Sequence, residues 1–191
     1  PGMSYNGNDL FIANVVRLLN LIYSHGGWKM LNTLGNSWNN YDIRDGYKFQ
    51  KKLTISDDRF IFTPYPNGGG EIYAGLLNSP VIHDFTKIET IAHELYHGLQ
   101  AEMGQGGASV FNEVTAYAYG LKIAENWQVA TSAWIAIPMN TLGNGTTSGD
   151  VYQSALANIR ANNYSTRDII NAVTNFKRGS LSNSNGMYNS F

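Results

Sequence analysis

The chain has no cysteine and few charged residues of either sign. Its 191 residues include 13 Lys or Arg and 14 Asp or Glu, which gives a formal net charge of -1. Without cysteine, disulfide bonds and thiol chemistry are excluded. A chain so close to neutral has no electrostatic basis for binding nucleic acid or an anionic membrane surface, and we expect neither as a partner.

Long hydrophobic runs are also lacking, because Asn, Arg and Gly interrupt the longest apolar stretches. No segment therefore reads as a signal peptide or a transmembrane span. Hydrophobic residues still make up 43% of the chain, which is enough to bury a core at this length. We expect one domain over residues 1–191, with residues 1–7 as a junction to another segment and residues 179–191 as a mobile tail.

The hydrophobic periodicity predicts an α+β domain. Apolar residues at helical spacing follow Asn8, a suitable cap, and Gly26 and Gly27 end this first helix. Three later segments rich in β-branched and aromatic residues suggest a small antiparallel or mixed sheet. The expected order is a helix over 9–23, a helical turn over 28–34, strands over 47–56, 59–63 and 71–76, helices over 86–103 and from 109 onward, and closing helices over 150–160 and 165–177.

The segment His93-Glu94-Leu95-Tyr96-His97 carries the most explicit chemistry in the chain. On a helix, His93 and His97 are one turn apart on the same face, so both can hold one Zn²⁺ through a ring nitrogen. Glu94 then lies beside the metal. Its carboxylate is placed to take a proton from a water that attacks a carbonyl and to pass it to the leaving amine. The spacing therefore predicts a zinc hydrolase.

A catalytic zinc normally takes three protein ligands, so two histidines are too few. Glu113 is the best candidate for the third. The first helix extends about six residues past His97, and the glycine-rich segment 104–108 lets the chain reverse. Ser109 can cap a second helix, which brings Glu113 close to level with His97 in an antiparallel pair.

Other residues stay open as ligands. Glu102 is the weaker carboxylate, because it lies on the first helix and would have to bend back over more than a turn. His83 precedes that helix by a short loop and is a remote alternative as a ligand or oxyanion donor, whereas Glu125 lies three turns beyond Glu113 and out of reach. Glu113 itself also reads as an ordinary surface residue on an amphipathic helix.

At these residues the chain resembles the zincin metallopeptidases. The downstream segment Asn112-Glu113-Val114-Thr115-Ala116 is similar to the gluzincin branch, whereas Gln100 and Met103 stand where a metzincin has Gly and His. The resemblance covers about residues 86–120. It implies an α+β domain whose cleft lies between the sheet edge and the active helix. It also implies a zinc held by the two histidines and Glu113, with Glu94 as general base and acid.

The resemblance has one departure, at Tyr117. Thermolysin-like members carry an acid there that orients the first histidine, so the partner of His93 stays open between Tyr117, Glu89 and a backbone carbonyl. The resemblance also implies a donor for the oxyanion that develops during attack, usually Tyr or His. Tyr117 is our first choice for this donor, ahead of Tyr73 and Tyr119.

In zincins an edge strand binds an extended peptide as an additional strand. Glu71-Ile72-Tyr73-Ala74-Gly75 is the candidate, with an interior strand as the alternative. In its size and its lack of cysteine, the chain is similar to the metallopeptidase domains of secreted bacterial effectors and polymorphic toxins.

We therefore expect a secreted or delivered zinc endopeptidase with a protein or peptide substrate, for which an immunity or inhibitor protein is a candidate partner. The alternatives are an inactive zincin-like binding module and a zinc hydrolase of another amide or ester.

Overall fold

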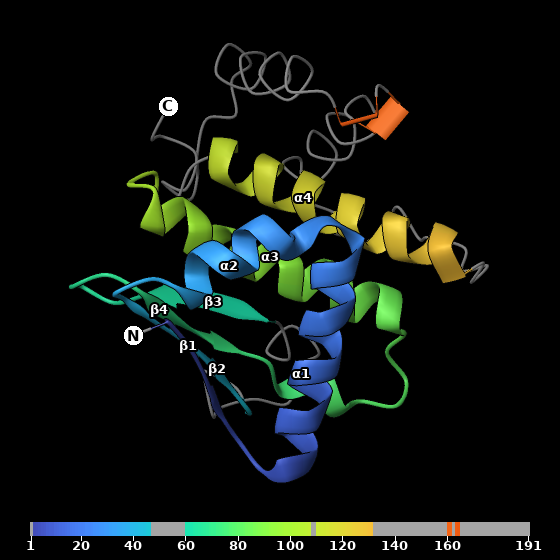
Figure 1. The fold of residues 1–191 in the computed structure, drawn as a ribbon, viewed down its shortest axis with the longest axis horizontal. Helices are drawn as coiled ribbons and strands as arrows, with labels where there is room; N and C mark the ends of the chain where they lie inside the picture. Colours follow the sequence, from blue (N-terminus) through green and yellow to red (C-terminus); the bar gives the residue numbers. More distant parts are fainter. Residues whose placement is uncertain (1, 47–59, 108–109, 132–159, 162, 165–191) are drawn as a thin grey trace, which may run out of the picture. The chain divides into compact units, whose positions relative to one another are not determined.

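The computed structural model describes residues 2–46, 60–107, 110–131, 160–161 and 163–164 (Figure 1). The chain divides into two compact units. The first comprises Pro1–Gly106 and Tyr119–Ala133, and the second comprises Gly107–Ala118 and Trp134–Phe191. Helix α4 (Val110–Thr131) carries residues of both units.

A mixed sheet of four strands forms one layer of the first unit. The strands are β1 (Gly2–Asn6), β2 (Asn40–Arg44), β3 (Ile61–Pro64) and β4 (Gly70–Tyr73). Their order is β1-β2-β4-β3; β1, β2 and β4 are parallel, and β3 runs antiparallel to β4. The expected α+β class is confirmed, and the sheet is of the mixed kind.

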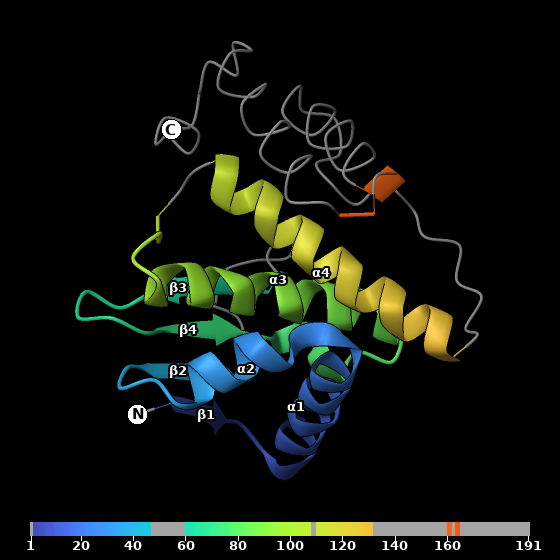
Figure 2. The same cartoon turned by 45° about the horizontal axis from the view of Figure 1, so that its top comes forward.

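Three helices lie on one face of this sheet (Figures 1 and 2). They are α1 (Asp9–Ile22), α2 (Trp28–Gly35) and α3 (Asp84–Glu102). The Asn8 side chain caps α1 by accepting a hydrogen bond from the Phe11 N–H at 2.9 Å, as the sequence predicts. A π-helical turn joins α1 to α2, and Gly26 within it has a φ of 118°, which a residue with a side chain rarely adopts.

The core lies between the sheet and these helices. Side chains alternate along β2, so Tyr41 and Ile43 are buried on the helix side while Asp42 lies on the opposite face. At the surface, the Arg17 guanidinium bonds both carboxylate oxygens of Asp84, at 2.6 and 2.8 Å, and so links α1 to the start of α3. The stripe of α3 that fills the core comprises Phe85, Ile88, Ile91, Ala92 and Leu95.

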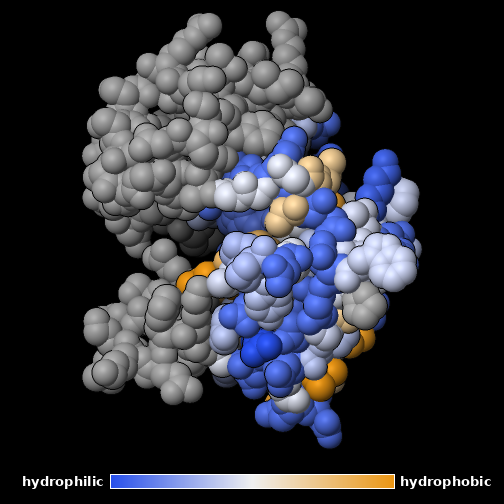
Figure 3. Space-filling view, turned by 90° about the vertical axis from the view of Figure 1, so that its left-hand side faces the viewer, coloured by the Kyte–Doolittle hydropathy of each residue, from blue (hydrophilic) through white to orange (hydrophobic). Residues whose placement is uncertain are grey.

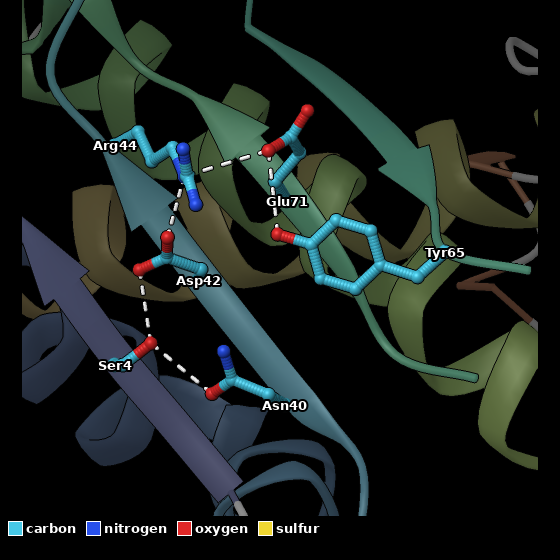
Figure 4. Close-up of polar contacts among 6 residues, drawn as sticks. All are labelled: Ser4, Asn40, Asp42, Arg44, Tyr65 and Glu71. Atoms are coloured by element: carbon cyan, nitrogen blue, oxygen red, sulfur yellow. Dashed lines mark hydrogen bonds and ion pairs between the residues drawn. The ribbon is translucent and has the colours of Figure 1, made fainter. Parts of the chain in front are cut away.

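A polar network occupies the face of the sheet opposite the helices (Figure 4). Asp42 accepts hydrogen bonds from Ser4 Oγ at 2.9 Å and from Arg44 Nε at 2.5 Å. Arg44 Nε also lies 3.4 Å from Glu71 Oε2, to which the Tyr65 hydroxyl donates at 3.3 Å. Because Asp42 is buried, its charge needs a partner of opposite sign, and Arg44 supplies it.

The described surface drawn in Figure 3 is mostly hydrophilic, with isolated hydrophobic residues among the polar ones. Single exposed hydrophobic side chains of this kind, such as Trp38, are common on globular proteins. None of the described helices combines the length and hydropathy that crossing a bilayer requires.

Two of the four strands were not predicted. Residues 2–6, which the sequence suggests as part of a junction, form β1, and Asn40–Arg44 form β2. The predicted strands over 59–63 and 71–76 correspond to β3 and β4. The strand predicted over 47–56, the closing helices over 150–160 and 165–177 and the tail over 179–191 lie outside the described residues, apart from position 160, which is helical.

The interpretation of Glu71–Gly75 as a peptide-binding edge strand is wrong. These residues begin in β4, which pairs with β2 on one side and with β3 on the other. A strand with neighbours on both sides has no unpaired backbone groups for a substrate. Among the described strands, β1 and β3 occupy the two edges of the sheet.

Candidate metal centre

Helix α3 places the His-Glu-x-x-His segment near its middle, in regular helical structure. The helix begins at Asp84, two residues before the predicted start, and the His83 carbonyl accepts the Lys87 N–H at 3.1 Å. His93 and Glu94 are buried on α3, and His97 is half-buried one turn further on. The apolar stripe faces the core, so the histidines stand at its border, where a polar site can form.

The ring nitrogens of His93 and His97 converge. Their Nε2 atoms lie 3.0 Å apart, and the ring planes meet at 82°. Two ligands of one tetrahedral zinc, each about 2.0–2.1 Å from the metal, lie about 3.4 Å apart, so this pair is close to the required spacing. Burial, together with the nearby His97, lowers the pKa of His93 well below its usual value. The neutral imidazole that a metal requires is therefore favoured.

Gln100 holds the other ring nitrogen of His97. The Nδ1 atom of His97 lies 2.9 Å from Gln100 Oε1, and Gln100 is buried near the end of α3. An amide oxygen can only accept, so Nδ1 carries the proton and Nε2 keeps its lone pair. Sequence reasoning used Gln100 only to exclude a metzincin. The spacing of three residues on one helix could have revealed the contact.

Helix α4 approaches α3 closely at Gly120. A Cβ atom on Gly120 would lie 2.4 Å from the backbone carbonyl oxygen of Glu89 and 3.3 Å from the backbone nitrogen of His93. Only glycine therefore fits here without a shift of the backbone. Glu113 precedes Gly120 by seven residues, about two turns on the same face of α4. The ligand atoms of His93, His97 and Glu113 all lie within 4.8 Å of one another, and this group could hold a metal ion.

The carboxylate of Glu94 lies beside these ligands. Its Oε2 accepts the backbone N–H of Phe62 at 2.7 Å, and its Oε1 lies 3.9 Å from His93 Nε2. Phe62 belongs to β3, so the edge strand orients one oxygen of Glu94 while the other is near the metal ligands. The sequence gives no sign of this contact, because 32 residues separate the two partners.

Glu102, considered from the sequence as an alternative metal ligand, bonds to β2 and the loop before it. Its carboxylate accepts hydrogen bonds from Ser37 Oγ at 2.6 Å, from Asn39 Nδ2 at 2.9 Å and from the Tyr41 hydroxyl at 2.5 Å. These donors, Ser37 first, lower the pKa of Glu102. The carboxylate thus ties the end of α3 to β2 and the loop before it. Within the described residues, the group that could hold a metal includes neither Glu102 nor His83.

The three candidate tyrosines lie in different surroundings. Tyr119 stacks on Tyr96 with ring centroids 4.5 Å apart, and burial raises the pKa of Tyr119 to about 12. Tyr73 follows the buried Ile72 on β4, so alternation places it on the sheet face away from α3. Tyr117 is half-buried on α4, one turn after Glu113, and its role as oxyanion donor stays a prediction.

Glu89, the carboxylate considered as partner of His93, lies one turn before it on α3. Burial raises the pKa of Glu89 to about 7, and the Thr90 hydroxyl donates to it at 3.2 Å. The partner that orients His93 stays a prediction, open between Glu89, Tyr117 and a backbone carbonyl.

No protein-family model matches the chain, and comparison with curated proteins and with solved structures gives no significant match.

Proposed function

We propose that this protein is a zinc-dependent endopeptidase. The observation that carries the proposal is the convergence of His93 Nε2 and His97 Nε2, 3.0 Å apart, with the Glu94 carboxylate 3.9 Å from the first of them. A structural pair of histidines does not need a carboxylate at that position. A hydrolytic site does, because a base must stand next to the attacking water.

The set of donors favours zinc. Two imidazoles and one carboxylate, from His93, His97 and Glu113, are typical of a catalytic zinc that leaves a further coordination position open. Zinc bound there would supply a Lewis acid that polarises a carbonyl and lowers the pKa of a water molecule. Magnesium and calcium prefer oxygen ligands, so two imidazoles disfavour them.

Glu94 moves the proton in this proposal. Its Oε1 takes a proton from the water that attacks the scissile carbonyl carbon, and the same carboxyl group then donates it to the amide nitrogen as the C–N bond breaks. The Phe62 N–H stays on Oε2 throughout and keeps the carboxyl group oriented. Protons balance, since the one removed from water leaves with the amine.

The position of β3 supports a polypeptide substrate. The Phe62 N–H bonds Glu94, so it points away from β4, the neighbour of β3 among the described strands. An extended peptide lying along this side of β3 would run past the Glu94 carboxylate; it would bond the carbonyl groups of the strand, because Glu94 already takes the Phe62 N–H and Pro64 has none. Edge-strand binding, expected at Glu71–Gly75, is accordingly proposed for Ile61–Pro64 instead.

Delivery to a target cell and an immunity partner remain predictions from the sequence.

The variant Glu94→Gln tests the proposal. Its amide oxygen can still accept the Phe62 N–H, so the fold and the bound zinc should be retained, whereas proton transfer is lost. We expect peptide cleavage, measured by mass spectrometry of new termini in a mixed peptide library, to fall at least about 100-fold. Full cleavage by Glu94→Gln would overturn the proposal. Zinc binding without any cleavage by the native chain would favour the inactive binding module.

A further inference from the structure

We infer that Gln100 is a positioning residue that sets the tautomer of His97 and thereby the affinity of the site for metal. The inference rests on the proposed function only for the identity of the metal. It concerns a residue on the same helix as the two histidines, three positions after His97.

The contact between Gln100 and His97 is short and enclosed. Gln100 Oε1 lies 2.9 Å from His97 Nδ1, and only 4% of the Gln100 surface is exposed. The backbone carbonyl of Gln100 also accepts the Gln105 backbone N–H at 2.7 Å, which anchors the main chain where the helix ends. A buried amide held at both its main chain and its side chain has few rotamers to choose from.

The chemistry of the amide decides the direction of this hydrogen bond. Gln100 Oε1 has no proton, so His97 must donate from Nδ1. The lone pair of the neutral ring then resides on Nε2, the atom that faces His93 Nε2 at 3.0 Å. Without Gln100, this hydrogen bond no longer selects one tautomer of His97. Groups that orient a ligating histidine in this way typically change metal affinity about 10–100-fold when removed.

Two substitutions separate positioning from packing. Gln100→Met keeps the length of the side chain but has no oxygen to accept the Nδ1 proton, and Gln100→Glu restores an acceptor at the same place. We expect zinc affinity, measured by competition with a chelator of known affinity, to fall about 10–100-fold in Gln100→Met and to stay within a few-fold of native in Gln100→Glu. Gln105→Met, at an exposed position nearby, is the matched control and should bind like the native chain.

The tautomer itself can be read without metal. In ¹⁵N-labelled, metal-free protein, the ring nitrogen shifts of His97 should show the proton on Nδ1 in the native chain and a mixture of tautomers in Gln100→Met. Unchanged zinc affinity in a folded Gln100→Met would overturn the inference, and so would a native His97 with its proton on Nε2. If the native protein binds no zinc, the proposed function fails, but the tautomer measurement still decides the role of Gln100. If Gln100→Met does not fold, the tautomer of His97 in the native chain and the zinc affinity of Gln100→Glu decide the role of Gln100.

Discussion

Two side chains of the candidate site are oriented by hydrogen bonds to neighbouring residues. One neighbour is 32 residues away in the sequence and the other is one helical turn away. The backbone of Phe62 holds Glu94, and the side chain of Gln100 holds His97. Both contacts involve buried groups, where a hydrogen bond restricts a side chain most strongly. At this scale, the motif supplies the candidate reactive groups, and its neighbours orient them.

Glu102 allows a prediction at the residue scale. Its carboxylate accepts three hydrogen bonds, from Ser37, Asn39 and Tyr41, and its pKa is lowered by them. A carboxyl group with a depressed folded pKa stabilises the fold above its unfolded pKa, and this stabilisation is lost as pH falls. We expect Glu102→Gln to lower the free energy of unfolding by about 1–2 kcal/mol at pH 7, after allowance for partial exposure.

The pH dependence checks the cause. Urea unfolding of the native chain and Glu102→Gln at a series of pH values should show the difference shrinking below about pH 4.3, the ordinary pKa of a glutamate. A difference that stayed constant between pH 7 and pH 3 would contradict the ionic origin of the effect. Zinc content should be unchanged by this substitution, because Glu102 lies outside the group of candidate ligands.

Helices α3 and α4 contact each other through their backbones at Gly120, beside the helical turn that carries His93. Gly120 has no side chain to separate the helices, and the stacked rings of Tyr96 and Tyr119 pack beside it. Glu113 lies two turns earlier on the same face of α4, and it belongs with the two histidines to the group that could hold a metal ion. The helix that carries the candidate third ligand thus contacts α3 at a glycine outside the candidate ligand group.

Gly120→Ala tests this arrangement. The added Cβ would lie 2.4 Å from the Glu89 carbonyl oxygen, a backbone atom that cannot swing aside, so α4 must shift. We expect a loss of about 1–3 kcal/mol in the free energy of unfolding, measured by urea titration, and weaker zinc binding. Gly35→Ala is the control, because a Cβ there meets nothing within 4 Å and the change should be nearly neutral. Native zinc affinity in a folded Gly120→Ala would contradict the role assigned to this contact.

For the whole molecule, the sequence predicted the elements whose signals are local. Helix α1 follows its cap at Asn8, and α3 was expected from its apolar stripe and its His-Glu-x-x-His spacing. Strands β1 and β2 were missed because they pair with each other across more than thirty residues of the chain, whereas β3 and β4 form a pair of sequence neighbours. For the same reason the sequence could not show that β4 is an interior strand or that β3 reaches Glu94.

The ligand group combines both kinds of information. The spacing of His93 and His97 is local, whereas Glu113 lies on a second helix, α4, sixteen residues after His97. The glycine-rich segment after α3 gave enough information to predict that the chain reverses. Which tyrosine, if any, serves the reaction depends on side-chain surroundings that spacing alone does not specify.

The most direct test of the account is the zinc content of the purified, untagged protein, measured by elemental analysis beside Glu113→Ala. Glu125→Ala, three turns further along α4, is the matched control. We predict close to one zinc per native chain and per control chain, and a sharp loss in Glu113→Ala. Zinc that survives the loss of Glu113, or a native chain that takes up no zinc when it is added back, would contradict the three-ligand site.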